Sequence, residues 1–184
     1  MPRWTPLLVG VTALWAASTA QAGSFDLNLG NNAIELNLAA PIAEGIAIGA
    51  GVLHSEYRED ATMLHGQIMG VERNRRMDIG VGARWTQFNT DYGNGGGLGL
   101  GGYGYVYLPN APAVSVGGYG FFTPSVATSG KLDDSFLAGA RMRYDFTPTV
   151  DGYVGYRRMT ADFDDQRSSR TLDNSVHVGV NLRF

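Results

Sequence analysis

The chain offers few side-chain combinations with the residue types of a catalytic site. His54, Ser55 and Glu56 are consecutive and contain the three residue types of a serine hydrolase. Neighbouring side chains on a strand point to opposite faces, however, so His54 and Ser55 are not expected to meet. His65 and His177 fall on faces expected to point inward, beside acidic residues. Each is better interpreted as an interior hydrogen-bonding group than as a catalytic base.

A glycine pattern, Gly97-x-Gly99-x-x-Gly102, matches the letters of a dinucleotide-binding fingerprint. No helix pattern follows it, and no Lys-Ser/Thr pair completes a phosphate-binding loop, so the motif lacks its structural context. Glycines that relieve crowding in a curved strand explain the pattern better. The chain has no cysteine, which excludes disulfides and thiol chemistry. We expect no cofactor.

Three aspartates, Asp162, Asp164 and Asp165, lie close together in a polar segment and offer oxygen ligands for a divalent cation. The segment lacks the glycine and the distal glutamate of a calcium-binding loop. A solvated loop is therefore the better interpretation. The sequence predicts no catalytic, cofactor or metal site, and we expect a protein that is not an enzyme.

The elements that carry these residues show a period of two, which is typical of strands with two chemically different faces. The sequence predicts ten such strands, at residues 25–29, 34–38, 46–55, 63–71, 77–86, 97–108, 113–123, 135–146, 150–159 and 175–184. The first two are only about six residues long, whereas a tilted membrane-spanning strand needs roughly 9–11. In residues 97–108 the bulky side chains change phase, which predicts a β-bulge at Gly101-Gly102.

The connections alternate between short turns and longer polar loops. Turns are expected around Pro41-Ile42 and at residues 73–75, 109–112 and 147–148, with loops at 56–62, 87–96, 124–132 and 160–171. Arg73, Arg75 and Arg76 are interpreted as part of a solvated turn. This alternation is typical of an up-and-down barrel whose turns face the periplasm and whose loops face outward. An even strand number places both termini on the periplasmic side.

One face of these strands is apolar, with aliphatic residues in the middle and aromatic residues near the ends. Two aromatic girdles are predicted, with Trp85, Phe88 and Phe136 on the loop side and Tyr107, Tyr144, Phe146 and Phe184 on the turn side. The other face carries charges of both signs, which pair more readily inside a membrane barrel than in a soluble core. The predicted lumen charge network comprises Asp26, Glu35, Asp78, Arg84, Arg141, Arg143, Asp145, Arg157 and Arg183.

Residues 1–22 have the pattern of a cleaved secretory signal peptide. Arg3 gives a positive start, residues 7–17 form a short apolar segment, and Ala20-Gln21-Ala22 resembles a cleavage site before Gly23. The apolar segment is too short for a membrane-spanning helix. Removing Arg3 changes the net charge from −3 to −4. The predicted mature domain, residues 23–184, lacks the clustered positive charge of a nucleic-acid-binding protein.

The chain ends on a strand whose outward residues, Val178, Val180, Leu182 and Phe184, resemble the C-terminal signature by which outer-membrane barrels are recognised for assembly. This ending, the mature start Gly23-Ser24-Phe25-Asp26-Leu27, the Gly30-Asn31-Asn32 link and the glycine-rich residues 95–107 together resemble the YfaZ family of outer-membrane proteins. The resemblance covers the whole mature chain. It implies an outer-membrane barrel and carries no functional residues with it.

Together these patterns predict an all-β protein of a Gram-negative outer membrane: a closed antiparallel transmembrane barrel of about ten strands, within a range of eight to twelve. A barrel of this size encloses little more than its own side chains, so the lumen is expected to be largely plugged. The expected role is structural or interactive. A narrow pore, an outer-membrane lipid-modifying enzyme and a soluble ligand-binding barrel are the alternatives.

The expected partners follow from the same location. They are outer-membrane lipids, lipopolysaccharide and the barrel assembly machinery, and no nucleic acid. Arg167 and Arg170 would contact lipopolysaccharide phosphates if their loop lies outside the cell. The sequence does not determine the oligomeric state.

Overall fold

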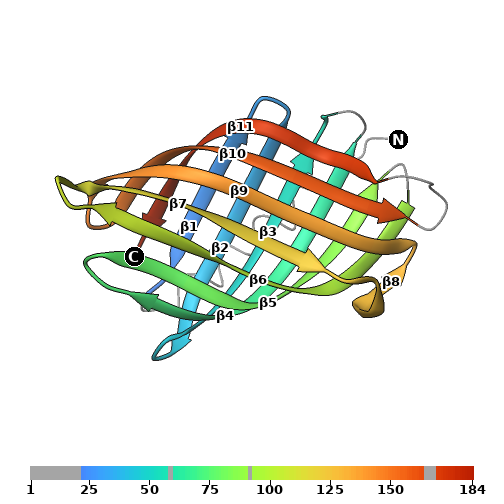
Figure 1. Ribbon diagram of the computed structural model, residues 1–184, viewed down its shortest axis with the longest axis horizontal. Coiled ribbons are helices and arrows are strands. Elements are labelled where there is room, and N and C mark those ends of the chain that lie inside the picture. Colours follow the sequence, from blue (N-terminus) through green and yellow to red (C-terminus); the bar gives the residue numbers. More distant parts are fainter. Residues whose placement is uncertain (1–21, 58–59, 91–92, 164–168) are drawn as a thin grey trace, which may run out of the picture.

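The computed structural model describes residues 22–57, 60–90, 93–163 and 169–184, and these form a β-barrel (Figure 1). The predicted signal peptide, apart from Ala22, lies outside the described residues. The barrel strands are β1 (Ser24–Gly30), β2 (Ala33–Ala43), β3 (Ile46–Ser55), β4 (Ala61–Arg73), β5 (Met77–Thr90), β6 (Gly93–Leu108), β7 (Ala111–Thr123), β9 (Leu132–Thr147), β10 (Val150–Phe163) and β11 (Arg170–Arg183).

Each barrel strand pairs in antiparallel fashion with its neighbours in the chain, and one further pairing, between the first and last strands, closes the ring. β1 pairs with β11 from Ser24 opposite Arg183 to Gly30 opposite His177. β5 pairs with β6 along its whole length, from Met77 opposite Val106 to Thr90 opposite Gly93. The prediction of a closed up-and-down barrel of about ten strands is confirmed. Closure gives every strand two partners, as a bilayer without hydrogen-bonding groups requires.

The loop between β7 and β9 contains two short elements outside the ring. A 3₁₀ turn, η2 (Ser125–Ala127), leads into the short strand β8 (Thr128–Gly130). β8 pairs with the loop end of β6, where Gly95 lies opposite Gly130. The loop predicted at residues 124–132 therefore folds back on the rim of the barrel (Figure 1).

The predicted β-bulge at Gly101-Gly102 is wrong. The β5–β6 register runs without interruption through both glycines, and the shift between β6 and β7 comes only at Tyr107 and Leu108. No bulge is needed because the two sets of bulky residues belong to different faces. Leu98 and Leu100 are exposed on the outside, whereas Tyr105 is buried inside.

Two residues assigned to the aromatic girdles lie in the lumen instead. Phe88 is only 1% exposed, and Tyr107 lies opposite the buried Ser115. Each lies an even number of positions from a charged or buried side chain of the same strand. Strand alternation therefore places both side chains inside the barrel. The remaining girdle residues are exposed on the outside: Trp85 and Phe136 toward the loops, and Tyr144, Phe146 and Phe184 toward the turns.

The second strand is longer than predicted, whereas the first is short, as predicted. β2 is 11 residues long and continues past Pro41 to Ala43, so the turn falls at Gly45, whose φ is +68°. β1 remains short at seven residues, and β11 extends beyond it toward the loops. Ser55 Oγ of β3 donates a hydrogen bond to the carbonyl of Leu172 in β11, 3.0 Å away. This contact joins β3 to β11 across the gap beyond the end of the short strand β1.

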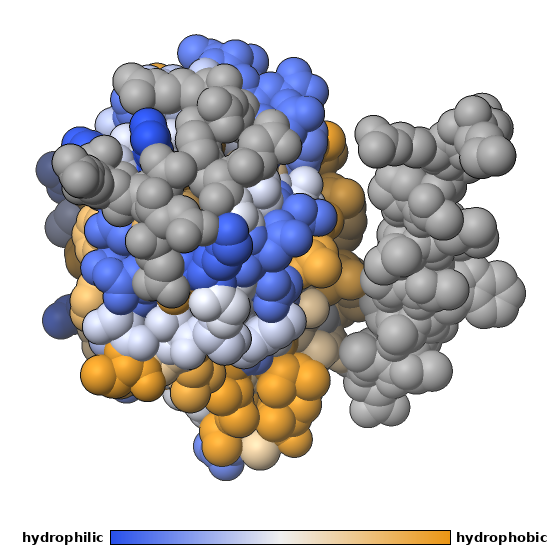
Figure 2. Space-filling view, turned by 90° about the vertical axis from the view of Figure 1, so that its right-hand side faces the viewer, coloured by the Kyte–Doolittle hydropathy of each residue, from blue (hydrophilic) through white to orange (hydrophobic). Residues whose placement is uncertain are grey.

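The outer surface of the barrel is apolar in the middle and polar at the loop end. Exposed aliphatic side chains line every part of this band, among them Ile48, Ile68, Val81, Leu100, Val116, Val154 and Val178. Figure 2, which looks onto the loop end, shows hydrophilic residues across that end and hydrophobic residues along the sides. In the described part of the chain, no helix has the length and hydropathy to cross a membrane.

Three tyrosines of the lumen lie directly across from a glycine on the neighbouring strand. The pairs are Tyr103 with Gly80, Tyr119 with Gly139, and Tyr153 with Gly179. A Cβ atom on Gly179 would lie 2.3 Å from Tyr153 Cζ, which is well inside van der Waals contact. The glycines therefore let the rings lie flat along the barrel wall instead of filling its centre.

If the outer band faces lipid, the loss of stability caused by a new charge should depend on where the charge is placed. In lipid vesicles, Val81→Arg is expected to lower the free energy of unfolding by about 2–4 kcal/mol, because Val81 is 70% exposed in the middle of the band. Val126→Arg, in η2 and outside the barrel, is expected to change it by less than about 0.5 kcal/mol. Urea unfolding followed by tryptophan fluorescence measures both. Equal costs for the two variants would contradict a lipid-facing band.

The tyrosine–glycine pairs predict that two glycine-to-valine substitutions differ in their effect on stability. Gly179→Val is expected to destabilise the barrel by about 1–3 kcal/mol, because the new side chain overlaps the Tyr153 ring. Gly66→Val adds the same atoms at an outward position where a Cβ would meet no atom within 4 Å, so its unfolding midpoint should not fall. If both variants unfold at the wild-type urea concentration, the packing argument fails.

Candidate functional site

The lumen is the candidate functional site because the charged residues gather there. All nine residues of the predicted network point inward from six strands, β1, β2, β5, β9, β10 and β11. Asp26, Glu35, Asp78, Arg84, Arg143 and Arg157 are buried, while Arg141, Asp145 and Arg183 are partly buried. The structure places eight of these residues in four groups along the barrel axis, which we describe from the deepest outward, and Arg84 apart from them.

The deepest group centres on Arg157 of β10, which is fully buried. Its Nη1 hydrogen-bonds Glu35 of β2, and its Nε hydrogen-bonds Asp173 Oδ2 of β11 at 2.6 Å. Ser175 Oγ donates a further hydrogen bond to the same Asp173 oxygen, at 3.2 Å. One guanidinium group thus links two strands that lie on either side of β1, beneath the first hairpin.

The second group surrounds Arg141 of β9. Its guanidinium carbon lies 4.3 Å from the ring centroid of Tyr153 and 4.8 Å from that of Tyr119, so the cation lies between two aromatic rings. Its terminal nitrogens are 3.8 Å from Asp26 Oδ2 and 3.9 Å from Glu35 Oε2. These are ion pairs without direct hydrogen bonds. Arg141 is therefore held mainly by stacking and by charge.

Asp26 in this group is held by neutral donors. Tyr153 Oη donates a hydrogen bond to Asp26 Oδ1 at 2.8 Å, and Asn37 Nδ2 donates to the same oxygen at 3.4 Å. Asn28 Nδ2 in turn donates to Tyr153 Oη at 3.2 Å. This chain joins β10 to β1 and β2 and fixes the Tyr153 ring that covers Gly179.

The third group lies nearer the turns and centres on Asp78 of β5. Asp78 Oδ2 accepts hydrogen bonds from Arg73 Nη2 at 2.9 Å and Arg143 Nη2 at 3.2 Å. Arg143 also donates from Nε to Ser115 Oγ and stacks on Tyr105, with 3.8 Å from its guanidinium carbon to the ring centroid. Arg73 ends β4 rather than lying in the turn, and its half-exposed side chain points back at Asp78.

The fourth group lies at the turn rim and involves Arg183 of β11. Its Nη2 hydrogen-bonds Asp151 of β10 and forms an ion pair with Asp145 Oδ1 at 3.5 Å. Its Nη1 donates to the carbonyl of Pro148 at 3.2 Å. This group ties the last strand to the β9–β10 turn.

Arg84 of β5 differs from the other lumen arginines in its partners. Its Nε and Nη2 both donate to Gln67 Oε1, at 3.0 and 2.7 Å, and its guanidinium carbon lies 3.6 Å from the centroid of the Phe121 ring. Among the described residues its hydrogen-bond partner is a neutral amide rather than a carboxylate. Arg84 marks the boundary between the charged and the apolar parts of the lumen.

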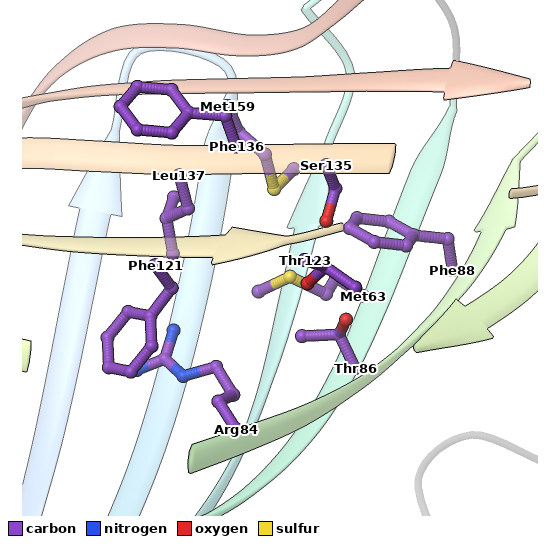
Figure 3. Close-up of a pocket in the computed structure, with 10 residues that line it drawn as sticks. All are labelled: Met63, Arg84, Thr86, Phe88, Phe121, Thr123, Ser135, Phe136, Leu137 and Met159. Carbon is purple, nitrogen blue, oxygen red and sulfur yellow. The ribbon is translucent and has the colours of Figure 1, made fainter. Parts of the chain in front are cut away.

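The loop half of the lumen is filled by an apolar cluster, which we call the lumen plug. Its buried members toward the loops are Leu53, Ala61, Met63, Phe88, Phe121, Leu132, Leu137, Met159, Ala161, Phe163 and Leu172. The void between them measures only about 10 Å³, which is at the lower limit for one water molecule. Figure 3 shows the Arg84 guanidinium group against the ring of Phe121, with Met63 and Phe88 on the other side of the pocket.

The turn half of the lumen contains a cavity of about 490 Å³. It extends from Arg84 and Phe121 in the middle of the barrel to Pro41, Arg73 and Phe184 at the turn end. The charged groups around Arg141 and Asp78 form its walls. The lumen is thus packed at the loop end and hollow at the turn end.

The hydrolase-like triplet does not assemble. His54 Nδ1 lies 3.0 Å from Thr62 Oγ1 and its Nε2 3.7 Å from Glu56 Oε1, on the outer side of β3. Ser55 points into the barrel, where it is fully buried. The expected separation of His54 from Ser55 is therefore present in the structure.

The other candidates divide between the lumen and the rim. His65 and His177 are buried in the lumen, and His177 lies edge-on to Tyr153. Gly97, Gly99 and Gly102 lie within β6 with no helix after them.

The acidic candidates lie near the loop rim. Asp162 lies in β10 opposite Asp134, while Asp164 and Asp165 lie outside the described residues. No group of three acidic or histidine side chains suited to a metal ion occurs among the residues described.

Sequence reasoning missed several members of the lumen network. Asp151 and Tyr153 share the parity of Arg157 in a strand that was predicted, so the alternation could have identified them. Asp173 lies just before the predicted last strand, at a register shift between β10 and β11 that brings Leu172 inside as well. Gln67 carries no charge, although it shares the parity of the inward His65.

The predicted contacts at the cell surface and during assembly stay predictions. Arg170 begins β11 opposite the buried Ala161, and Arg167 lies outside the described residues. Val178, Val180, Leu182 and Phe184 are exposed on the outer face of the barrel, as an assembly signature requires.

Comparison with solved structures finds outer-membrane barrels at low sequence identity. The KdgM porin is 11% identical, with a TM-score of 0.45 and coverage of 89% of this chain and 99% of that one. The NanC porin is 12% identical, with a TM-score of 0.43 and coverages of 88% and 98%. Neisserial surface protein A is 12% identical, with a TM-score of 0.42 and coverages of 89% and 94%. A search of curated proteins gives no match.

The comparison with protein-family models gives a match over nearly the whole chain. The family model described as YfaZ precursor matches residues 7–184. The apolar outer band, the aromatic girdles and the charged lumen are those of an outer-membrane barrel, so the predicted location is confirmed. With a match over nearly its whole length, the chain belongs to the YfaZ family, as the residues of its first and last strands had indicated.

Proposed function

We propose that this protein is a non-enzymatic outer-membrane barrel with a closed lumen, which acts through its outer loops and its contacts with lipid. The observation that carries the proposal is the lumen plug. Its buried apolar side chains pack together across the loop half of the barrel, and the void among Met63, Phe88 and Phe121 measures only about 10 Å³. The protein would then act through the surfaces that face the membrane and the outside of the cell, in a structural or interaction role.

The separation of His54 from Ser55 supports the non-enzymatic part of this proposal. Ser55 Oγ is occupied by the carbonyl of Leu172, and its buried position keeps it from a lipid substrate outside the barrel. A nucleophile needs a base within hydrogen-bond reach, and His54 lies on the opposite face. A lipid-modifying activity built on this triplet therefore has no geometric support.

A narrow pore is the second candidate, and the cavity at the turn end favours it. The cavity of about 490 Å³ already opens half of the lumen, and only the plug separates it from the loop side. A rearrangement of the plug side chains would be needed to complete a channel. The two proposals differ in one measurable property, which is conductance.

Planar bilayer recordings test the closed lumen. Purified protein is expected to insert without reproducible unit conductance, because the apolar side chains of the plug pack closely across the lumen. A general porin of about 16 strands, inserted under the same conditions, should give clear conductance steps and serves as the positive control. Discrete steps from the purified protein, absent from detergent alone, would replace the closed-lumen proposal by the pore.

The deepest charged group predicts a large contribution to stability. Arg157→Met is expected to lower the free energy of unfolding by about 3–5 kcal/mol, since it leaves Asp173 buried without its cation and Glu35 with only the more distant Arg141. Arg158→Met, the next residue but outward-facing and exposed, should change it by less than about 0.5 kcal/mol. Urea unfolding in vesicles measures both variants. A small effect at position 157 would show that the network does not hold the barrel together.

A further inference from the structure

The cavity in the turn half of the lumen has the composition of a binding site, which neither the family match nor the proposed function assigns. We propose that it binds a small organic anion, in which a carboxylate or a phosphate monoester is attached to a ring of hexose size, and that this anion enters from the turn end. The volume of about 490 Å³ is within the range of about 300–1,000 Å³ that is usual for small-molecule sites.

The charge of the cavity wall favours an anion. Among the described residues, five arginines but only three carboxylates line the cavity. At the rim, Arg183 is neutralised by Asp145 and Asp151, which are not part of the cavity wall. The positive surplus therefore lies further inside, around Arg84, Arg141 and Arg143.

These inner arginines retain donors that an oxyanion would use. Arg84 is about nine-tenths buried, and its partner among the described residues is the Gln67 amide rather than a carboxylate. Arg141 Nε has no hydrogen-bond partner, and the terminal nitrogens of Arg141 lie beyond hydrogen-bond distance from Asp26 and Glu35. Tyr119 Oη, on the same wall, is also without a partner. Guanidinium groups with open donors recognise planar oxyanions well.

The walls of the cavity favour a cyclic body for this anion. Tyr103, Tyr105 and Tyr119 line it, and the first and last of these rings lie flat over Gly80 and Gly139. Flat aromatic faces pack well against the ring of a sugar or an aromatic acid. The plug closes the far end, so a ligand that enters from the turn side is held rather than passed on.

Titration calorimetry on the full barrel in detergent tests this site, with D-glucuronate, glucose 6-phosphate and glucose as probes. We expect saturable binding of one or both anions, weakened by added salt, and no binding of glucose. Binding of glucuronate alone would identify a carboxylate ligand, and binding of glucose 6-phosphate alone a phosphate ester. If neither anion gives saturable heat at about 10 mM, or if glucose binds equally well, the proposal is wrong.

Two arginine variants locate the site. Arg84→Gln should weaken anion binding at least about tenfold, because it removes donors without leaving a carboxylate unpaired, so the fold is retained. Arg158→Gln makes the same charge change on the outside of β10 and should bind as the wild type does. Heat-modifiable mobility on a denaturing gel confirms that both variants are folded. Unchanged affinity in folded Arg84→Gln protein would overturn the proposal even if anions bind elsewhere.

Discussion

The hydrocarbon core of a membrane offers no partner to a backbone amide or carbonyl, and the whole structure follows from the need to satisfy these groups within the chain. Ten strands meet this need by closing on themselves, with β1 paired to β11. Closure leaves each strand with one face toward lipid and one toward the lumen. Where the ring is incomplete, above the short β1, side chains take over: Ser55 reaches the carbonyl of Leu172 across the gap.

A ring of this size has too little room for bulk water and too much for aliphatic side chains alone. The protein fills it in two ways. Apolar side chains pack the loop half, and arginines paired with carboxylates and tyrosines line the turn half. The tyrosine–glycine pairs contribute to the second arrangement, because a ring that lies flat on the wall leaves space in the centre of the lumen.

The charged residues of the lumen serve two purposes that depend on their depth. Arg157 is enclosed by Glu35 and Asp173, so its role is to hold strands together in a medium where a lone charge would be costly. Arg84 is held by an amide and Arg141 mainly by aromatic faces, and Arg141 Nε has no hydrogen-bond partner. The first arrangement is typical of a stabilising ion pair, and the second of a site that recognises a charge from outside.

The strand pattern alone was enough to predict the closed barrel, its strand number, and the inward placement of all nine charged residues. A period of two is local, so residues such as Asp78 and Arg84 are assigned to a face without knowledge of their neighbours. The same reasoning failed where a face was judged by residue type: Phe88 and Tyr107 were assigned to lipid, although their parity places them inside. Only the tertiary structure decided which charges meet. Arg157 contacts Glu35 across 122 residues of sequence, and Gln67 is bound to Arg84 without any charge to indicate it. Such contacts depend on register and barrel closure, which strand periodicity does not encode.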